Sequence, residues 1–391
     1  MLRSLYSGIS GLRSHQTMLD VTGNNIANVN TTAFKSSATQ FRDTLSQLTQ
    51  GAGGPQAQVG GTNPSQIGLG VQVAGISTNF AQGSAQATGR ATDIMISGDG
   101  FFVTQLGGET LYTRAGSFDF DASGRLVAPD GSIVQGWGAV NGVVTEGGAI
   151  GAIQLPLDAL APAVATSAAT LGGNLPSDAA TGTSLVRDVQ VYDASGAART
   201  LTLTFTKNGA DWDVSGDDGT GATALPTLTF TDGALTSAPT TGVVNGVTVD
   251  LAKLTGFADL TTVSVTNQNG RDAGSLDSFT LAKDGTIVGS FSNGTSEAVG
   301  RIVLATFVNP GGLEKAGSSS YRATFNSGNP EVGAPGSDGR GSLASGALEM
   351  SNVDLSQEFT NLIVAQRGFQ ANARIITTSD EVLQELTNLK R

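Results

Sequence analysis

The stretch LRSLYSGISGLRSHQTML (residues 2–19) places apolar residues three and four positions apart, and LSQEFTNLIVAQRGFQANARIITTSDEVLQELTNLKR (residues 355–391) does the same at the other end. An apolar period of about 3.5 residues is typical of a coiled-coil seam. Both seams contain polar residues of the kind that fixes register, namely Gln16 in the first and Gln366 and Asp380 in the second. The assembly seam we predict consists of Leu2, Leu5, Ile9, Leu12 and Leu19, together with Leu355, Phe359, Leu362, Phe369, Ile376 and Leu383. Two terminal seams that need partners indicate a subunit that polymerises.

Between its two ends the chain has the composition of β-structure. Of its 54 glycines, three lie in residues 1–50 and one in residues 355–391, so all the others lie in residues 51–354. Short runs rich in Val, Thr and Ile alternate with turn signals, and Asn208-Gly209 before Trp212 is a strong hairpin signal. The predicted fold class is therefore mainly β with terminal α-helices.

The order of these segments predicts nested β domains. FDFDASGRLV (residues 118–127) resembles FTLAKDGTIV (residues 279–288), so the two segments are expected in one discontinuous inner domain that flanks an inserted outer domain. The alternative is that any hairpin has this pattern. The expected boundaries are 1–27 and 355–391 for a helical coiled-coil pair, 28–70 for an extended Asn/Gly-rich connector, 71–145 and 280–354 for the inner β domain, and 146–279 for the outer β domain.

Charge and composition exclude several classes of function. The net charge of −12 falls on the β middle, because the N-terminal 50 residues are slightly basic and the C-terminal helix is neutral. An acidic surface argues against nucleic-acid binding. The absence of cysteine removes disulfide, zinc-cluster and thiol chemistry, and no apolar stretch reaches the roughly 18 residues that membrane insertion requires. Without a signal-peptide core, the general rules predict a cytosolic protein.

No motif supports catalysis or a cofactor. Asp119, Asp121, Ser123 and Asp130 have the spacing of a calcium loop, but their flanks alternate like strands, so hairpin tips are the expected explanation. The only histidine, His15, lies in the first helix, where a surface or interface role is expected. We therefore predict no enzyme activity, no catalytic residue, no metal site and no cofactor.

The segment LDVTGNNIANVNTTAFK (residues 19–35) resembles the signature of bacterial flagellar rod and hook proteins. Further similarity lies in GLGV (68–71), DIMISGDGFF (93–102), TRAGSF (113–118), FVNPGGL (307–313), SNVDL (351–355) and QRGFQANAR (366–374). The motif residues are Asn24, Asn25, Ile26, Ala27, Asn28, Asn30, Thr31, Phe34 and Lys35. The resemblance covers roughly residues 1–145 and 280–391, with Ala33 as a small departure where glycine is common.

The resemblance implies an axial structural protein, and the length of the insertion is most similar to hook members of the family. Such a subunit polymerises into a flexible, curved, extracellular tube that acts as a universal joint and transmits torque from rod to filament. Implied partners are further copies of the chain, the rod and hook–filament junction proteins, the hook cap and the type III export apparatus, which replaces a cleaved signal peptide. The alternatives are a distal-rod or hook-associated axial protein and, from another class, an extracellular calcium- or glycan-binding β-protein.

The terminal helices are further expected to be disordered in the monomer and to fold on assembly. Gly8 and Gly11 weaken the first helix by about 1 kcal/mol each relative to alanine. Two weak helices bury too little surface to offset the ordering of their backbones at ~1–2 kcal/mol per residue.

Overall fold

The computed structural model describes residues 2–56, 60–140, 142–155 and 160–388. The chain divides into two compact units. The first consists of Met1–Leu155, Thr280–Val288 and Ala298–Arg391, and the second of Pro156–Phe279 and Gly289–Glu297. The sequence boundary expected at residue 146 therefore lies within the first unit, and a short later segment, residues 289–297, belongs to the second. Whether the inserted segment folds independently stays a prediction.

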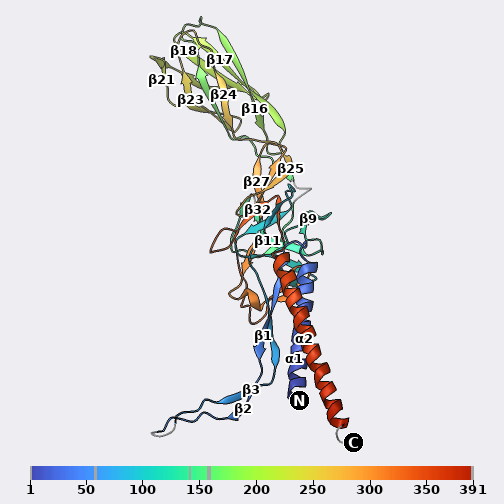
Figure 1. Cartoon of the computed structure of the whole chain (residues 1–391). Helices are drawn as coiled ribbons and strands as arrows, with labels where there is room; N and C mark the ends of the chain where they lie inside the picture. Colours follow the sequence, from blue (N-terminus) through green and yellow to red (C-terminus); the bar gives the residue numbers. More distant parts are fainter. Residues whose placement is uncertain (1, 57–59, 141, 156–159, 389–391) are drawn as a thin grey trace. The chain divides into compact units, whose positions relative to one another are not determined.

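Two helices from opposite ends of the chain lie side by side in the first unit (Figure 1). They are α1 (Leu2–Ala27) and α2 (Leu355–Asn388). Helix α1 ends among asparagines, where the Asn28 side chain donates to the Asn24 carbonyl (2.9 Å). Helix α2 begins after Asp354, whose Oδ1 accepts from the amide of Ser356 (2.8 Å), as expected of an N-cap. No helix in the described residues combines the length and apolarity needed to cross a membrane.

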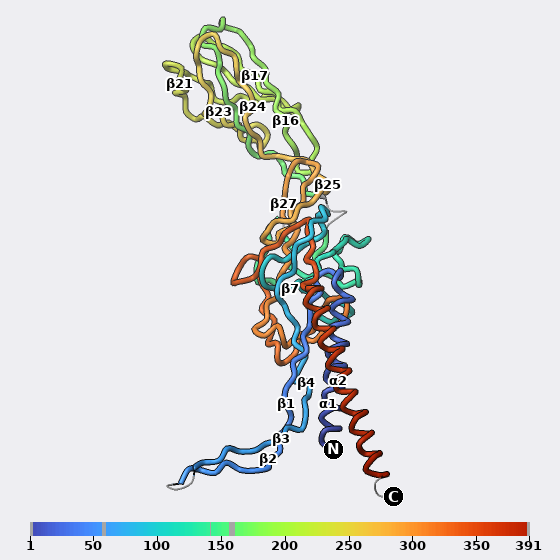
Figure 2. Tube along the Cα trace, viewed as in Figure 1, coloured from blue at the N-terminus to red at the C-terminus, as the bar shows by residue number. Residues whose placement is uncertain are grey.

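The segment expected to be a connector, residues 28–70, contains one complete two-stranded ladder and one strand of another. Strand β1 (Ser37–Asp43) pairs antiparallel with β4 (Val71–Thr78), and β2 (Ser46–Gln50) pairs with β3 (Ser65–Gly68). Figure 2 shows the β2–β3 arm leading away from the β1–β4 ladder. The strands of this arm were not predicted because both of its faces are exposed, so they lack the apolar alternation that identifies half-buried strands. Its role as a connector stays a prediction.

The main sheet of the first unit combines strands from both sides of the insertion. Its order runs β27-β11-β7-β8-β30-β29. The buried aromatic rings of Phe101, Tyr112, Phe307 and Tyr321 meet edge to face, with centroids 4.8 Å apart for Tyr112 and Phe307 and 5.9 Å for Phe101 and Tyr321. Offset and edge-on aromatic contacts of this kind stabilise cores beyond their buried area. Residues about 200 positions apart in the chain thus share one core.

The remaining elements of the first unit are short strands and one 3-10 turn. They are β5 (Ala85–Ala87), β6 (Ile94–Ser97), β7 (Phe101–Leu106), β8 (Glu109–Thr113), β9 (Asp119–Phe120), β10 (Leu126–Val127), β11 (Ile133–Val140), β12 (Val143–Val144), β13 (Gly151–Ala152), β28 (Leu304–Thr306), η1 (Pro310–Gly312), β29 (Glu314–Gly317), β30 (Ser320–Arg322), β31 (Glu331–Gly333), β32 (Ser342–Ser345) and β33 (Ala347–Glu349). Strands β26 (Thr286–Phe291) and β27 (Ser296–Ile302) each extend across a unit boundary.

The two similar segments form the same turn. The Asp121 amide donates to the Arg125 carbonyl (3.0 Å) and the Gly124 amide to the Asp121 carbonyl (2.9 Å). At the matching positions, the Ala282 amide donates to Thr286 (2.9 Å) and the Gly285 amide to Ala282 (3.0 Å). The glycine in each turn has a positive φ, 75° and 81°, which explains why glycine occupies both positions.

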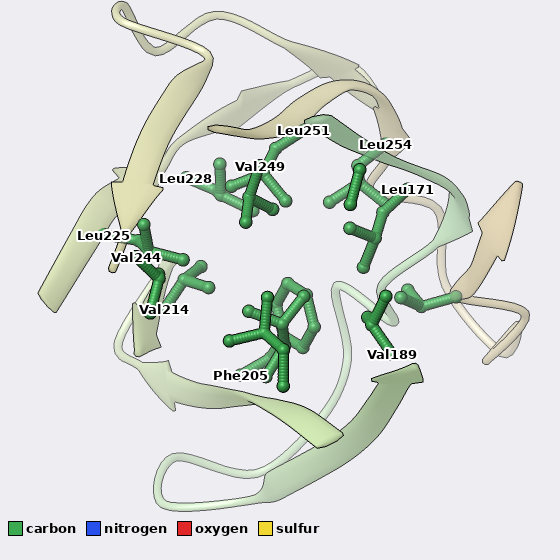
Figure 3. Packing of buried hydrophobic residues seen from close by; sticks show 14 of the residues in the cluster. Leu171, Val189, Phe205, Val214, Leu225, Leu228, Val244, Val249, Leu251 and Leu254 are labelled. Carbon is green, nitrogen blue, oxygen red and sulfur yellow. The ribbon is translucent and has the colours of Figure 1, made fainter. Parts of the chain in front are cut away.

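The second unit packs two sheets around an apolar core (Figure 3). One sheet has the order β16-β17-β18-β19, and the other β20-β21-β23-β15-β24 with β22 beside β23. Trp212 and Phe205 are completely buried between them. The hairpin predicted at Asn208-Gly209 is confirmed, because Asn208 pairs with Asp211 across the turn. The strands are β14 (Leu160–Ala161), β15 (Ala168–Asn174), β16 (Ser184–Tyr192), β17 (Ala198–Asn208), β18 (Asp211–Asp217), β19 (Thr223–Leu228), β20 (Phe230–Thr231), β21 (Ala234–Leu235), β22 (Thr241–Val244), β23 (Val247–Thr255), β24 (Ser264–Gln268) and β25 (Gly274–Leu281), the last extending into the first unit.

Candidate assembly site

The asparagine run at the end of α1 has a structural centre at Asn25. Its side-chain Nδ2 donates to the Ser37 carbonyl (2.8 Å) and to Glu358 Oε1 (3.1 Å), and its Oδ1 accepts from the Ser37 amide (3.0 Å). Asn25 is 1% exposed, so a buried amide joins α1, β1 and α2 at one point. A buried amide that satisfies both its donor and its acceptor fixes the geometry of the elements around it.

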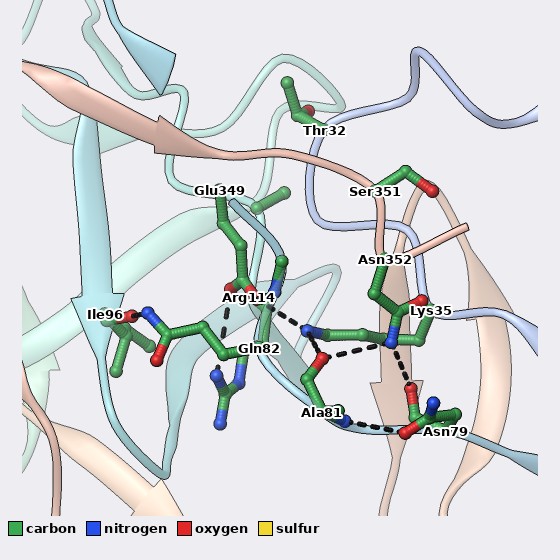
Figure 4. Close-up of polar contacts among 12 residues, drawn as sticks. Thr32, Lys35, Asn79, Ala81, Gln82, Ile96, Arg114, Glu349, Ser351 and Asn352 are labelled. Carbon is green, nitrogen blue, oxygen red and sulfur yellow. Dashed lines mark hydrogen bonds and ion pairs between the residues drawn. The ribbon is translucent and has the colours of Figure 1, made fainter. Parts of the chain in front are cut away.

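Lys35 follows this junction and is completely buried together with Glu349. Its Nζ donates to Glu349 Oε1 (2.6 Å) and to the Ala81 carbonyl (2.8 Å), while the Gly83 amide donates to the same carboxylate oxygen (2.8 Å). Arg114 approaches the other carboxylate oxygen, with Nη1 3.7 Å from Glu349 Oε2 (Figure 4). Burial lowers the pKa of Lys35, and the Glu349 carboxylate opposes that shift. One carboxylate thus faces two buried cations.

Asn352 closes the cluster from the segment before α2. Its Oδ1 accepts from the Ser36 amide (2.8 Å), and its Nδ2 donates to the carbonyls of Asn79 (2.8 Å) and Ala81 (3.0 Å). Figure 4 shows Asn352, Lys35 and Ala81 converging. Both ends of the chain are therefore bonded to the same short segment, residues 79–83, where β4 ends.

Ala33 has the backbone conformation that explains the glycine common at this position. Its φ is +56°, in the left-handed region, and its amide donates to the Glu349 carbonyl (2.8 Å). For residues other than glycine this region costs about 1–2 kcal/mol. The one departure from the motif therefore carries a local strain that glycine would not.

The contact between α1 and α2 is made by small and polar residues. A Cβ on Gly11 would lie 2.6 Å from the Asn372 side chain, and a Cβ on Gly368 would lie 2.3 Å from the ring of His15. A Cβ on Gly8 would lie 3.4–3.5 Å from Ile375 and Ile376, which is an ordinary van der Waals contact, so this position has room for a methyl group. Gly11, which we expected only to weaken the first helix, therefore allows the two helices to approach closely, as does Gly368.

The predicted seam residues lie only partly in this contact. Leu5, Ile9, Leu12 and Leu19 are half-buried, as are Leu362, Phe369, Ile376 and Leu383. Phe359 is 51% exposed, Leu355 is also exposed, and the polar members Gln16, Gln366 and Asp380 face solvent. The side chain of Leu2 lies outside the described residues. A role for these residues between copies of the chain stays a prediction.

His15 occupies the junction of three elements. Its Nδ1 lies 2.8 Å from the Gly11 carbonyl, and its ring lies 5.6 Å from that of Phe41 on β1. Gly368 of α2 also lies close to the ring, so the imidazole packs between α2 and β1. This is the interface role expected from the sequence.

The acidic residues that have the spacing of a calcium loop lie in turns and form salt bridges. Asp121 accepts from the Ser123 and Arg125 amides and pairs with the Arg125 guanidinium (2.7 Å), and the Arg125 hydrogen bonds lower its pKa. Asp119 pairs with Arg90 (3.2 Å), and Asp130 accepts from Ser132. Across the described residues, no three acidic or histidine side chains gather as metal ligands.

Sequence reasoning missed the acidic partners of the motif. Lys35 and Asn25 belong to the motif found in the sequence, but Glu349 and Glu358 lie more than 300 positions away. The available signal was Glu349 itself, a single acid in the otherwise uncharged run GSLASGALEMSNV (residues 341–353).

A pocket of about 510 Å³ opens beside the motif. Phe34 and Tyr321 supply its aromatic surface, Lys315 lies over the Phe34 ring at 5.3 Å, and the turn Gly317–Ser319 forms its edge. Asn24, Asn28 and Thr31 of the motif also line it, as does the adjacent Thr32. With Phe34, four motif residues thus face a cavity.

Comparison with known proteins agrees with the motif assignment. Residues 5–35 match the family described as flagella basal body rod protein, residues 95–167 the flagellar hook protein FlgE/F/G D1 domain, and residues 344–389 the flagellar basal body rod FlgEFG protein C-terminal.

Full-length relatives extend these matches. The chain is 40% identical over 442 aligned residues to the flagellar hook protein FlgE of Borreliella burgdorferi, with 100% of both chains covered. It is 36% identical over 392 residues to the flagellar basal-body rod protein FlgG of Bacillus subtilis, again with 100% of both covered. A solved structure of Helicobacter pylori flagellar hook protein FlgE2 aligns with 68% of this chain and 100% of its own, at 16% identity and a TM-score of 0.48.

Proposed function

The chain belongs to the flagellar hook and rod protein family, and from this premise we propose that it is the structural subunit of a flagellar hook. The observation that carries the proposal is the end-to-end match to a hook protein at 40% identity, which includes the inserted segment as well as the shared ends. The residues at the motif act as structural anchors: buried amides and charges hold the ends of the chain together, and we assign them no catalytic step.

We propose that the terminal helices complete their packing only between copies. The α1–α2 contact buries small residues such as Gly11 and Ala365. Meanwhile α2 exposes Phe359, Ile363, Val364, Ile375, Val382 and Leu386. Exposed apolar side chains along a helix favour association with further helices. Of these exposed residues only Phe359 belongs to the predicted seam, so they support association through a broader face of α2. Disorder of the ends in the monomer is a separate proposal.

A flexible joint that transmits torque from rod to filament is the mechanical role we propose for the polymer. Glycine-rich turns absorb changes in backbone angle with little steric cost. Export in an unfolded state through the flagellar type III apparatus, and contact with the hook cap and junction proteins, complete the proposal. The absence of cysteine supports it, because an unfolded chain without thiols forms no disulfides during export.

A distal-rod protein is the second candidate, and the full-length match to a rod protein at 36% identity favours it specifically. The two functions predict polymers of different shape. Electron microscopy of polymers assembled from the purified full-length chain separates them. Curved tubes support the hook, straight rigid tubes support the rod, and failure to form any tube contradicts both.

A further inference from the structure

The largest unexplained features of the first unit are the pocket beside Phe34 and an exposed apolar pair, Val308 and Phe325. Phe325 has 110% relative exposure and Val308 has 86%, so neither contributes to the core of its own chain. A fully exposed phenylalanine beside a fully exposed valine is uncommon on a surface without a partner.

The backbone segments that carry the two apolar side chains are hydrogen-bonded to each other. The Asn309 amide donates to the Ser327 carbonyl (3.3 Å), and its side-chain Nδ2 donates to the Asn326 carbonyl (2.9 Å). Gly312 packs so closely that a Cβ there would lie 2.7 Å from the backbone of Asn326 and Ser327. We call Val308 and Phe325 the knob. Its bonded backbone leaves little conformational entropy to lose on docking.

The charges beside the two features are complementary. Lys315 in the pocket donates to Ser37 Oγ (2.9 Å) and lies over the Phe34 ring, so its partners within the described chain are neutral. Glu331 lies near the knob at the start of β31, where its carbonyl accepts from Thr306 Oγ1 (3.4 Å), and its side chain is exposed. Neither charge forms a salt bridge among the described residues.

The strands that carry these features suit head-to-tail contact. The turn of the β29–β30 hairpin, Gly317–Ser319, forms the edge of the pocket, while Phe325 follows the end of β30. Neither Val308 nor Phe325 lines the pocket, so the pocket and the knob are separate features of one unit. A contact between different surfaces of identical chains is heterologous, and it propagates into an open helical polymer unless its rotation closes a ring.

We propose that the pocket beside Phe34 receives the knob of a second copy of the chain, with Glu331 of that copy facing Lys315. The proposal rests on the hook function above and names the residues of one contact within the polymer. Phe325 enters between Phe34 and Tyr321, and the hydroxyl and amide groups of the motif surround it.

Charge reversal tests the pairing in the full-length chain. Lys315→Glu and Glu331→Lys are each expected to raise the critical concentration for polymerisation about three- to tenfold, because each places like charges together. The double variant is expected to return towards wild type. Asp277→Lys is the matched control: it makes the same charge change as Glu331→Lys on an exposed strand residue of the second unit, away from the pocket and the knob. A double variant no better than the single variants overturns the pairing.

Engineered cysteines test the contact itself, because the chain has none of its own. Ser318→Cys chains mixed with Asn326→Cys chains, which keep Phe325, are expected to form disulfide-linked dimers when the polymer is oxidised, and neither variant alone is expected to do so. Tubes that form normally without linked dimers refute this contact but leave the hook proposal standing. If the wild-type chain forms no tubes, the hook proposal fails and this inference fails with it.

Discussion

Replacing Glu349 by glutamine should destabilise the first unit more than any other single loss of charge on the described chain. Glu349 Oε1 accepts from Lys35 Nζ (2.6 Å) and the Gly83 amide (2.8 Å), and Arg114 Nη1 lies 3.7 Å from Oε2. Both Lys35 and Glu349 have 0% side-chain exposure, and Arg114 has 3%. A glutamine keeps the shape and one acceptor oxygen but leaves two buried cations without their shared counter-charge.

The magnitude follows from the cost of an unpaired buried charge. Removing one partner of a buried ion pair costs about 3–5 kcal/mol, far more than loss of a surface pair. Lys35→Met should cost less than Glu349→Gln, because Arg114 still neutralises the carboxylate. The double variant should lose less than the sum of the two single variants, by at least about 1 kcal/mol, since the side chains share one hydrogen-bonded pair.

The two tryptophans make the measurement specific to each unit. Trp137 lies in the first unit and Trp212 in the second, and the chain has no others. In a Trp212→Phe background, urea unfolding followed by fluorescence therefore reports the first unit alone. Glu109→Gln, which removes an exposed partner of Arg322, is the control and should change little. A Glu349→Gln chain whose first unit unfolds within 1 kcal/mol of its parent would refute the reasoning.

Four further outcomes are expected. Gly368→Ala should destabilise the α1–α2 contact by about 1–3 kcal/mol, because its methyl group meets the His15 ring. Adding His15→Ala should restore the stability of the contact, as measured by a circular-dichroism melt. Equal melting temperatures for the single and the double variant would contradict this packing. Ala33→Gly should change the free energy of unfolding by less than about 1 kcal/mol, because relief of the strain in the left-handed backbone offsets the loss of a buried methyl group. Ala33→Val should lower the free energy of unfolding by more than about 2 kcal/mol. Hydrogen bonds from Asn245 and Thr220 lower the pKa of Asp218 from 3.8 to about 2. The stability that these bonds confer is therefore present above pH 3.8 and is lost as the pH falls through about 2. An NMR titration of the Asp218 carboxyl group with a midpoint at the ordinary value would contradict this. Residues 146–279 expressed alone should melt cooperatively, and a melt without a transition would count against the predicted outer domain.

The elements that follow short-range rules could be predicted from the sequence. Helix α1 ends at Ala27 because the next residues are asparagines, and the Asn208-Gly209 turn forms where its dipeptide predicts it. The likeness of residues 118–127 to residues 279–288 corresponds to the same turn with the same two hydrogen bonds. Each of these features depends on a few consecutive residues, so it can be predicted without knowledge of the tertiary structure.

The β2–β3 arm and the role of the helix glycines could not be predicted in this way. The arm has no buried face, so its sequence carries no alternation to detect. Gly11 has low helix propensity in isolation, and only the close approach of Asn372 explains it. Propensity describes a helix alone, whereas packing depends on what lies against it.

The helical ends, the glycine-rich β middle and the motif of an axial flagellar subunit can all be recognised in the sequence, because periodicity, turn chemistry and motifs are local. Which distant charges meet is visible only in the folded chain. Lys35 and Glu349 are 314 positions apart, and Asn25 and Glu358 are 333 apart. These pairs exist only in the folded chain. A charge or amide is stable in the interior only where the fold places a partner beside it, and no local sequence pattern predicts which distant residue that partner is.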